Sequence, residues 1–241
     1  MQAFVHGIDA AVDVLELDVR RTLDGVLVVN HDAKVVKGTP SIKRLLFADL
    51  PKLADGQALA TLEGVAELAR ARGAKLAVEI KERGYEREIV NALQSHLGND
   101  QFEVISFYNT SLKRVEAMDG GIRTGLLAPR VPGMIRESGA YRGVVALMDK
   151  LDWQPSLNRG ARVGADYVSV DIGMATPRFI AGAERRGIPL DVWTVDQVTD
   201  MERLVTSGVQ GIVTDHPDVA MNVRASLLAA SEHSAAVVKT A

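Results

Sequence analysis

The order of apolar and polar residues predicts a chain in which strands and helices alternate. Short runs that are apolar nearly throughout, such as 75–81, 102–107 and 166–170, are each followed by a segment with helical spacing that ends at a glycine. The alternation repeats about seven times, and strict alternation implies parallel strands joined by helical crossovers. Strands that are apolar on both sides belong to a sheet that is covered on both faces. The pattern therefore predicts an α/β fold.

Three features favour a closed barrel over an open sheet. The first strand is not followed by a Gly-x-Gly-x-x-Gly turn, no composition break marks a second domain, and polar residues occur at the C-terminal ends of many strands. In a barrel those ends converge on one mouth. The length of 241 residues is also usual for one α/β barrel. We expect a single barrel domain over residues 1–230, followed by a C-terminal tail over 231–241.

The most informative stretch is 13–32, in which Glu16 and Asp18 lie in an apolar run that predicts a strand. Side chains two residues apart in a strand point to the same face, so these two carboxylates should project together. The apolar residues between and beside them should point the other way. Two adjacent carboxylates repel unless a cation lies between them, and a hard divalent metal is the simplest such cation.

Further strand ends carry residues that fit the same site. Glu79 and Lys81 repeat the two-residue spacing, so Glu79 could be a third carboxylate ligand and Lys81 could neutralise a phosphate oxygen. Taken alone, the two residues favour a salt-bridged strand end, whereas beside Glu16 and Asp18 they favour a functional site. His31 follows the apolar run 26–29, and histidine is the residue type best suited to general acid or base work near neutral pH. Trp193 ends a later strand and fits either the core or the wall of the mouth, where we expect it to contact the substrate.

Carboxylates, a lysine and a histidine around one mouth suggest metal-assisted attack at a phosphate ester. A metal there would neutralise the charge that develops on the phosphoryl oxygens. A ligand set made of oxygen atoms favours Mg²⁺ or Ca²⁺ over Zn²⁺. The expected partner is a small-molecule phosphodiester.

Composition excludes several other classes. The net charge of −3 and an aromatic fraction of 5% argue against nucleic acid as a partner. The chain has no cysteine, which removes disulfides and thiolate sites and fits a reducing compartment. It shows no signal peptide and no apolar run long enough to span a bilayer. We expect a cytoplasmic protein without stable membrane insertion.

Several motifs occur in an order that matches a known family. They are Asp13–Val19, Thr22-x-Asp24-Gly25, His31-Asp32, Leu62-Glu63, Glu79–Lys81, Ser106-Phe107, Trp193–Val195 and Gly211–Asp215 with Pro217. On these motifs the chain resembles the glycerophosphodiester phosphodiesterases from about residue 3 to 222. The first block is the most specific of them.

The resemblance implies a TIM-type barrel of the phospholipase C-like phosphodiesterase type. It also implies a bound divalent cation and cleavage of glycerophosphodiesters to glycerol 3-phosphate and an alcohol. By resemblance, Glu16, Asp18 and Glu79 would be metal ligands, His31 a general acid or base, and Lys81 a phosphate contact.

One departure from the family concerns its first strand. That strand ends in His-Arg-Gly and precedes a Glu-Asn-Thr loop, and neither has a counterpart here. We therefore expect an incomplete or permuted barrel with seven evident strands. Its two edge strands would have unpaired backbone groups, which favour association with another chain. The tail from residue 234 could fill the gap beside the 13–19 strand, although a frayed terminus is the simpler expectation. Alternatively, the start site was chosen too late or the gene is truncated. In that case a homo-oligomer would cover the open edge of the barrel.

Three functions remain open at this point. The first is metal-dependent hydrolysis of glycerophosphodiesters, impaired by the missing histidine and arginine. The second is an inactive homologue that binds a metal or a phosphate ligand. The third is a related lipid phosphodiesterase. The absence of an obvious apolar docking loop counts against it, but the pattern of residues 129–160 is unclear.

Overall fold

The computed structural model describes residues 1–52, 56–128, 154–230 and 237–240, with the single residues 139, 143, 144 and 147. Most of the stretch 129–160, whose sequence pattern is unclear, therefore lies outside the described residues.

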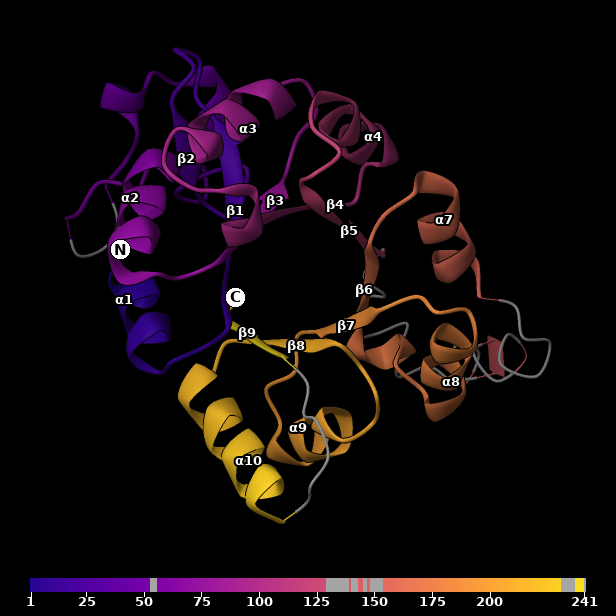
Figure 1. The fold of residues 1–241 in the computed structure, drawn as a ribbon. Coiled ribbons are helices and arrows are strands. Elements are labelled where there is room, and N and C mark those ends of the chain that lie inside the picture. The colour runs from indigo at the N-terminus through magenta and orange to yellow at the C-terminus, as the bar shows by residue number, and fades with distance from the viewer. Residues whose placement is uncertain are drawn as a thin grey trace. The chain divides into compact units, whose positions relative to one another are not determined.

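Strands and helices alternate along the described chain, as the sequence predicts (Figure 1). The strands are β1 (Val14–Arg21), β2 (Leu27–Val29), β3 (Leu76–Ile80), β4 (Phe102–Ser106), β5 (Arg123–Leu127), β6 (Tyr167–Asp171), β7 (Leu190–Trp193), β8 (Gly211–Thr214) and β9 (Val237–Thr240). The α-helices are α1 (Gln2–Asp9), α2 (Leu62–Arg72), α3 (Glu86–Gln94), α4 (Asn109–Met118), α7 (Pro155–Val163), α8 (Pro177–Arg185), α9 (Val198–Val205) and α10 (Pro217–Ala230). Short 3₁₀ turns lie at Ile42–Arg44, Phe47–Asp49, Asn99–Gln101 and Ile172–Met174. The seven expected strands are present, together with β2 and β9.

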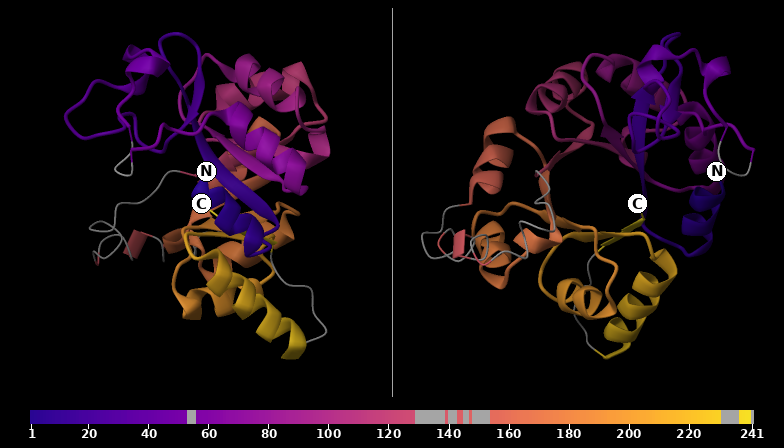
Figure 2. Two further views of the ribbon diagram at one scale, coloured as in Figure 1. Left: turned by 90° about the vertical axis from the view of Figure 1, so that its left-hand side faces the viewer. Right: turned by 180° about the vertical axis from the view of Figure 1, so that it is seen from behind.

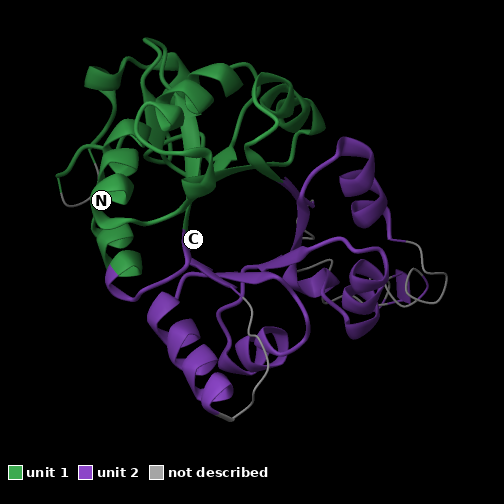
Figure 3. Ribbon diagram, viewed as in Figure 1, with its two compact units in different colours: residues 1–8, 15–124 green, residues 9–14, 125–241 purple. Residues whose placement is uncertain are grey.

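The chain divides into two compact units (Figure 3). Unit 1 comprises residues 1–8 and 15–124, and unit 2 comprises residues 9–14 and 125–241.

In unit 1, β3 pairs in parallel with β1 and with β4, and β2 pairs antiparallel with the other edge of β1. The parallel pairing places Asp18 opposite Glu79. β3 and β4 are buried along their whole length, which agrees with their nearly continuous apolar sequence.

Helix α2 shows how local sequence sets the connections in unit 1. The Thr61 hydroxyl accepts a hydrogen bond from the Gly64 N–H at 3.1 Å and so caps the first turn. The helix ends at Gly73, whose φ of 66° is left-handed and disfavours a side chain. Both boundaries follow from the local sequence, because capping depends on neighbouring residues alone.

In unit 2, strands β5 to β9 pair in parallel in chain order. Val168, Val192, Ile212 and Val238 come from four successive strands, and all four are fully buried in one apolar cluster. Helices α9 and α10 lie side by side over the last strands (Figure 2).

The C-terminal tail corrects one expectation from the sequence. A frayed terminus was the simpler expectation, but residues 237–240 form β9, which pairs in parallel with β8. The Asp13 backbone N–H donates to the Val238 carbonyl at 3.0 Å, and the Asp13 carboxylate accepts from the Val238 N–H at 2.8 Å. β9 therefore lies next to the residue that precedes β1. A homo-oligomer is not needed to cover β8, and the expectation of one stays a prediction.

A buried ion pair attaches β9 to the rest of unit 2. The Lys239 ammonium lies 2.8 Å from an Asp191 carboxylate oxygen on β7, and the two side chains are 3% and 1% exposed. The ammonium also donates to the Tyr167 hydroxyl at 3.3 Å. Breaking such a pair costs more than its formation gains, because one charge remains buried without its partner.

No helix in the described part of the chain is long and apolar enough to cross a membrane.

Replacing Lys239 tests the attachment of β9. We expect Lys239→Met to lower the free energy of unfolding by about 3–5 kcal/mol, because the buried Asp191 carboxylate loses its cation. Urea denaturation followed by circular dichroism measures this loss. The double variant Lys239→Met/Asp191→Leu should recover most of it, and Lys113→Met, at an exposed position of α4, should change stability by less than about 0.5 kcal/mol. A loss below about 1 kcal/mol for Lys239→Met would contradict the assignment.

Candidate active site

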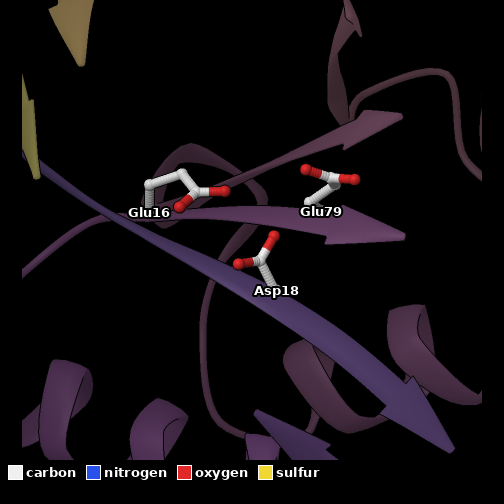
Figure 4. Close-up of side chains that lie close together, drawn as sticks. All are labelled: Glu16, Asp18 and Glu79. Carbon is white, nitrogen blue, oxygen red and sulfur yellow. The ribbon is translucent and has the colours of Figure 1, made fainter. Parts of the chain in front are cut away.

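Three carboxylates from two neighbouring strands of unit 1 form the most concentrated acidic group in the described chain (Figure 4). Glu16 and Asp18 project from β1, and Glu79 projects from β3 toward them. One oxygen atom from each side chain lies within 4.8 Å of the other two. The sequence predicted that these three residues would meet.

Strand geometry explains why the carboxylates meet. Along β1, the apolar residues at 15, 17 and 19 are at most 2% exposed, whereas Glu16 and Asp18 face the other side and are half-buried. The β1–β3 register then places Glu79 directly opposite Asp18. Alternation within one strand and pairing between two strands are therefore sufficient to assemble the cluster.

Lys81 bridges two of the carboxylates. Its ammonium lies 2.8 Å from an oxygen of Asp18 and 2.9 Å from an oxygen of Glu79. The Lys81 side chain is only 11% exposed, so these pairs are shielded from water. Burial by itself would lower the pKa of Lys81, but the carboxylates of Glu79 and Asp18 outweigh it and raise that pKa. Lys81 is therefore held in its charged form.

The pKa of Glu79 shows that the cost of burying its ionised carboxylate is only partly compensated. Burial raises its pKa to about 7, against the opposing effect of the Lys81 ammonium, and the neighbouring Asp18 carboxylate raises it further. One lysine therefore does not fully compensate the negative charge of the group.

These residues fit a hard divalent cation. Carboxylate oxygens are the ligands that Mg²⁺ and Ca²⁺ prefer, and three of them converge here from rigid strands. The raised pKa of Glu79 also indicates that further positive charge would stabilise the ionised cluster.

His31 lies near the cluster along the backbone but is not part of it. The Asn30 N–H donates to the Asp18 carbonyl at 2.9 Å, which attaches this segment to β1. The His31 side chain is 74% exposed, and its Nδ1 lies 2.9 Å from an Asp32 carboxylate oxygen. The acidic group found among the described residues does not include it. Its catalytic role stays a prediction.

Arg20 is a site residue that the sequence analysis missed. Its guanidinium donates to the His31 carbonyl at 2.7 Å and forms an ion pair with Glu82 at 3.0 Å. It therefore connects the histidine segment to the chain that follows β3. The signal was present in the sequence, because Arg20 follows Asp18 by two residues and so continues the face that carries the carboxylates.

Trp193 ends β7 in unit 2 and is half-buried. Its expected contact with substrate stays a prediction.

Solved structures share the fold of this chain. A glycerophosphodiester phosphodiesterase from Parabacteroides distasonis matches with a TM-score of 0.75 at 20% identity, over 94% of this chain and 90% of that one. A phosphodiesterase from Oleispira antarctica, solved with the product sn-glycerol-3-phosphate, matches with a TM-score of 0.71 at 18% identity, over 93% of this chain and 88% of that one. The fold is thus the TIM-type (β/α) barrel of such phosphodiesterases.

Sequence comparison identifies the family. The model of the glycerophosphoryl diester phosphodiesterase family matches residues 1–219. A glycerophosphodiester phosphodiesterase from Caldanaerobacter subterraneus subsp. tengcongensis is 28% identical, over 92% of this chain and 89% of its own length. The chain belongs to the glycerophosphoryl diester phosphodiesterase family, which is a family of hydrolases.

The raised pKa of Glu79 predicts a pH dependence of stability in a solution that contains a chelator. Between pH 4.5, the ordinary pKa, and about 7, folded Glu79 keeps a proton that the unfolded chain releases. The free energy of unfolding should therefore fall with rising pH across this interval, by about 1–3 kcal/mol. Urea denaturation at several pH values measures the slope.

Two variants test the source of that slope. Glu79→Gln should abolish it, because the amide does not titrate, whereas Glu67→Gln, at an exposed position of α2, should retain it. An unchanged slope in Glu79→Gln would show that another group is responsible.

Proposed function

We propose that this protein hydrolyses glycerophosphodiesters to glycerol 3-phosphate and an alcohol. The observation that carries the proposal is the convergence of Glu16, Asp18 and Glu79 with Lys81 beside them, in a chain of this family. The Oleispira antarctica structure, which holds sn-glycerol-3-phosphate, supports the choice of product.

We assign Glu16, Asp18 and Glu79 as ligands of a Mg²⁺ or Ca²⁺ ion. An ion bound there would neutralise the negative charge on the phosphate oxygens. The two strands hold the carboxylates in place before binding, so little conformational entropy is lost when the ligands are used.

In the reaction, a water oxygen bonds to phosphorus and releases a proton to solvent, the bond from phosphorus to the alcohol oxygen breaks, and the alcohol leaves with a proton that His31 donates and then regains from solvent. We assign to Lys81 the contact with a non-bridging phosphate oxygen. Its position next to Asp18 and Glu79 places a fixed positive charge where the phosphate would have to approach the carboxylates.

We assign to His31 the transfer of a proton to the leaving alcohol. In the protonated ring, Nδ1–H donates to the Asp32 carboxylate, which orients the ring, and Nε2–H remains available to donate to the alcohol. The hydrogen bonds from Arg20 to the His31 carbonyl hold the segment that carries this histidine.

A hydrolysis assay tests the metal assignment. The substrates are glycerophosphocholine and glycerophosphoethanolamine, and each is assayed with Mg²⁺, with Ca²⁺ and with a chelator. We expect turnover that requires the metal and is lost in Asp18→Asn, because the amide is a weaker ligand without negative charge. Addition of metal should also raise the melting temperature of the wild type and not that of Asp18→Asn. The control Asp100→Asn, at an exposed position, should behave as the wild type in both assays. Full activity in the chelator would contradict the metal assignment.

Removing His31 tests the proton transfer. We expect His31→Ala to lower kcat by about 10²–10⁴-fold, the usual contribution of general acid or base catalysis. His6→Ala, at an exposed position of α1, is the matched control and should retain activity. A kcat for His31→Ala within about twofold of the wild type would exclude the assigned role.

An inactive, ligand-binding homologue is the second candidate. The exposure of the His31 side chain, outside the carboxylate group, favours it. Two results together would select this candidate over hydrolysis. The protein would turn over neither substrate, and it would bind a metal that Glu16→Gln no longer binds.

A further inference from the structure

A basic cavity in unit 1 adjoins the carboxylate cluster. It has a volume of about 640 Å³, which lies within the range of roughly 300–1,000 Å³ that is usual for small-molecule sites. Its charged lining residues are Arg20, Arg21, Lys43, Lys81, Glu82 and Arg83. The roles assigned above to Lys81 and Arg20 do not account for the presence of Lys43 and Arg83 in the lining.

The cavity holds more positive charge than its own carboxylate can neutralise. Five of its lining residues are lysine or arginine, and Glu82 is the single acidic one. Glu82 is shared between Arg20 at 3.0 Å and Lys43 at 4.0 Å. Arg83 lies over the Tyr108 ring, 5.3 Å from its centre, and has no carboxylate within ion-pair distance in the described part of the chain. Carboxylates outside the lining pair with Arg21 and with Lys81, so the guanidinium of Arg83 is the cation of the lining that has no carboxylate partner among the described residues. This guanidinium favours an anionic ligand.

Lys81 connects this cavity to the cluster. It lines the cavity, and its ammonium also contacts Asp18 and Glu79. Arg20 continues the face of β1 that carries Asp18, and Arg83, in the bend after β3, lines the same cavity as Lys81. A ligand whose phosphodiester lies at Lys81 can therefore extend a second group into the cavity.

We propose that the cavity binds a second phosphate, carried by the leaving alcohol of the substrate. The preferred substrates are then glycerophosphodiesters of phosphorylated alcohols, and a cationic alcohol such as choline is disfavoured. Arginine presents a planar fork of N–H donors that matches phosphate oxygens, and Arg83 is free of the ion pairs that occupy Arg20 and Arg21. This inference rests on the function proposed above.

A matched pair of substrates tests the inference. Glycerophosphoinositol 4-phosphate and glycerophosphoinositol differ only in the second phosphate. We expect the wild type to have a kcat/KM about 10- to 100-fold higher for the phosphorylated ester, as expected for charge-assisted hydrogen bonds to one phosphate. The double variant Arg83→Gln/Lys43→Gln should reduce this ratio to about threefold or less. Lys34→Gln/Lys37→Gln, at exposed positions outside the cavity, makes the same change of charge and should retain the ratio.

Calorimetry provides a readout that does not depend on turnover. We expect the wild type to bind myo-inositol 1,4-bisphosphate more tightly than myo-inositol 1-phosphate, and the Arg83→Gln/Lys43→Gln variant to lose this difference. Hydrolysis of both esters with equal kcat/KM, or a preference that survives in this variant, would overturn the inference and leave the proposed function intact. Absence of hydrolysis together with a binding difference that the variant removes would overturn the proposed function and support the phosphate site.

Discussion

Asp18 on β1 and Glu79 on β3 are partners in a parallel register, and this pairing holds two carboxylates side by side in a place largely shielded from water. Two neighbouring carboxylates make each other's ionisation more costly, and burial adds to that cost. The Lys81 ammonium offsets part of it, since it lies within 2.9 Å of both carboxylates. The candidate chemistry of unit 1 depends on this arrangement.

The same strand geometry continues from acidic to basic residues. The face of β1 that carries Glu16 and Asp18 next presents Arg20, and the chain after β3 presents Lys81 and then Arg83. Negative charge thus gathers along the strands, and positive charge gathers in the last residues of β1 and just after β3. A phosphodiester requires both, because a cation must be held close to its phosphate and the rest of an anionic substrate must be attracted.

A different constraint acts in unit 2. β9 pairs with β8, and its Lys239 is buried against Asp191 on β7. A buried ion pair of this kind contributes little net stability but opposes any register that would separate its charges. The last strand is thereby given one position in the sheet although it is only four residues long.

Local and periodic features could be predicted from the sequence. The helix boundaries at Thr61 and Gly73, the alternation of β1 and the grouping of Glu16 with Asp18 depend on neighbouring residues or on strand period, and these are visible in any sequence. Adding Glu79 to this pair of carboxylates required only the expectation that its strand lies parallel and next to β1. Other features depend on contacts between distant parts of the chain. The position of β9, the burial that raises the pKa of Glu79, and the gathering of Arg20, Lys43 and Arg83 around one cavity arise from packing. Tertiary structure alone decided these features, because desolvation and charge proximity depend on distances that residue spacing does not contain.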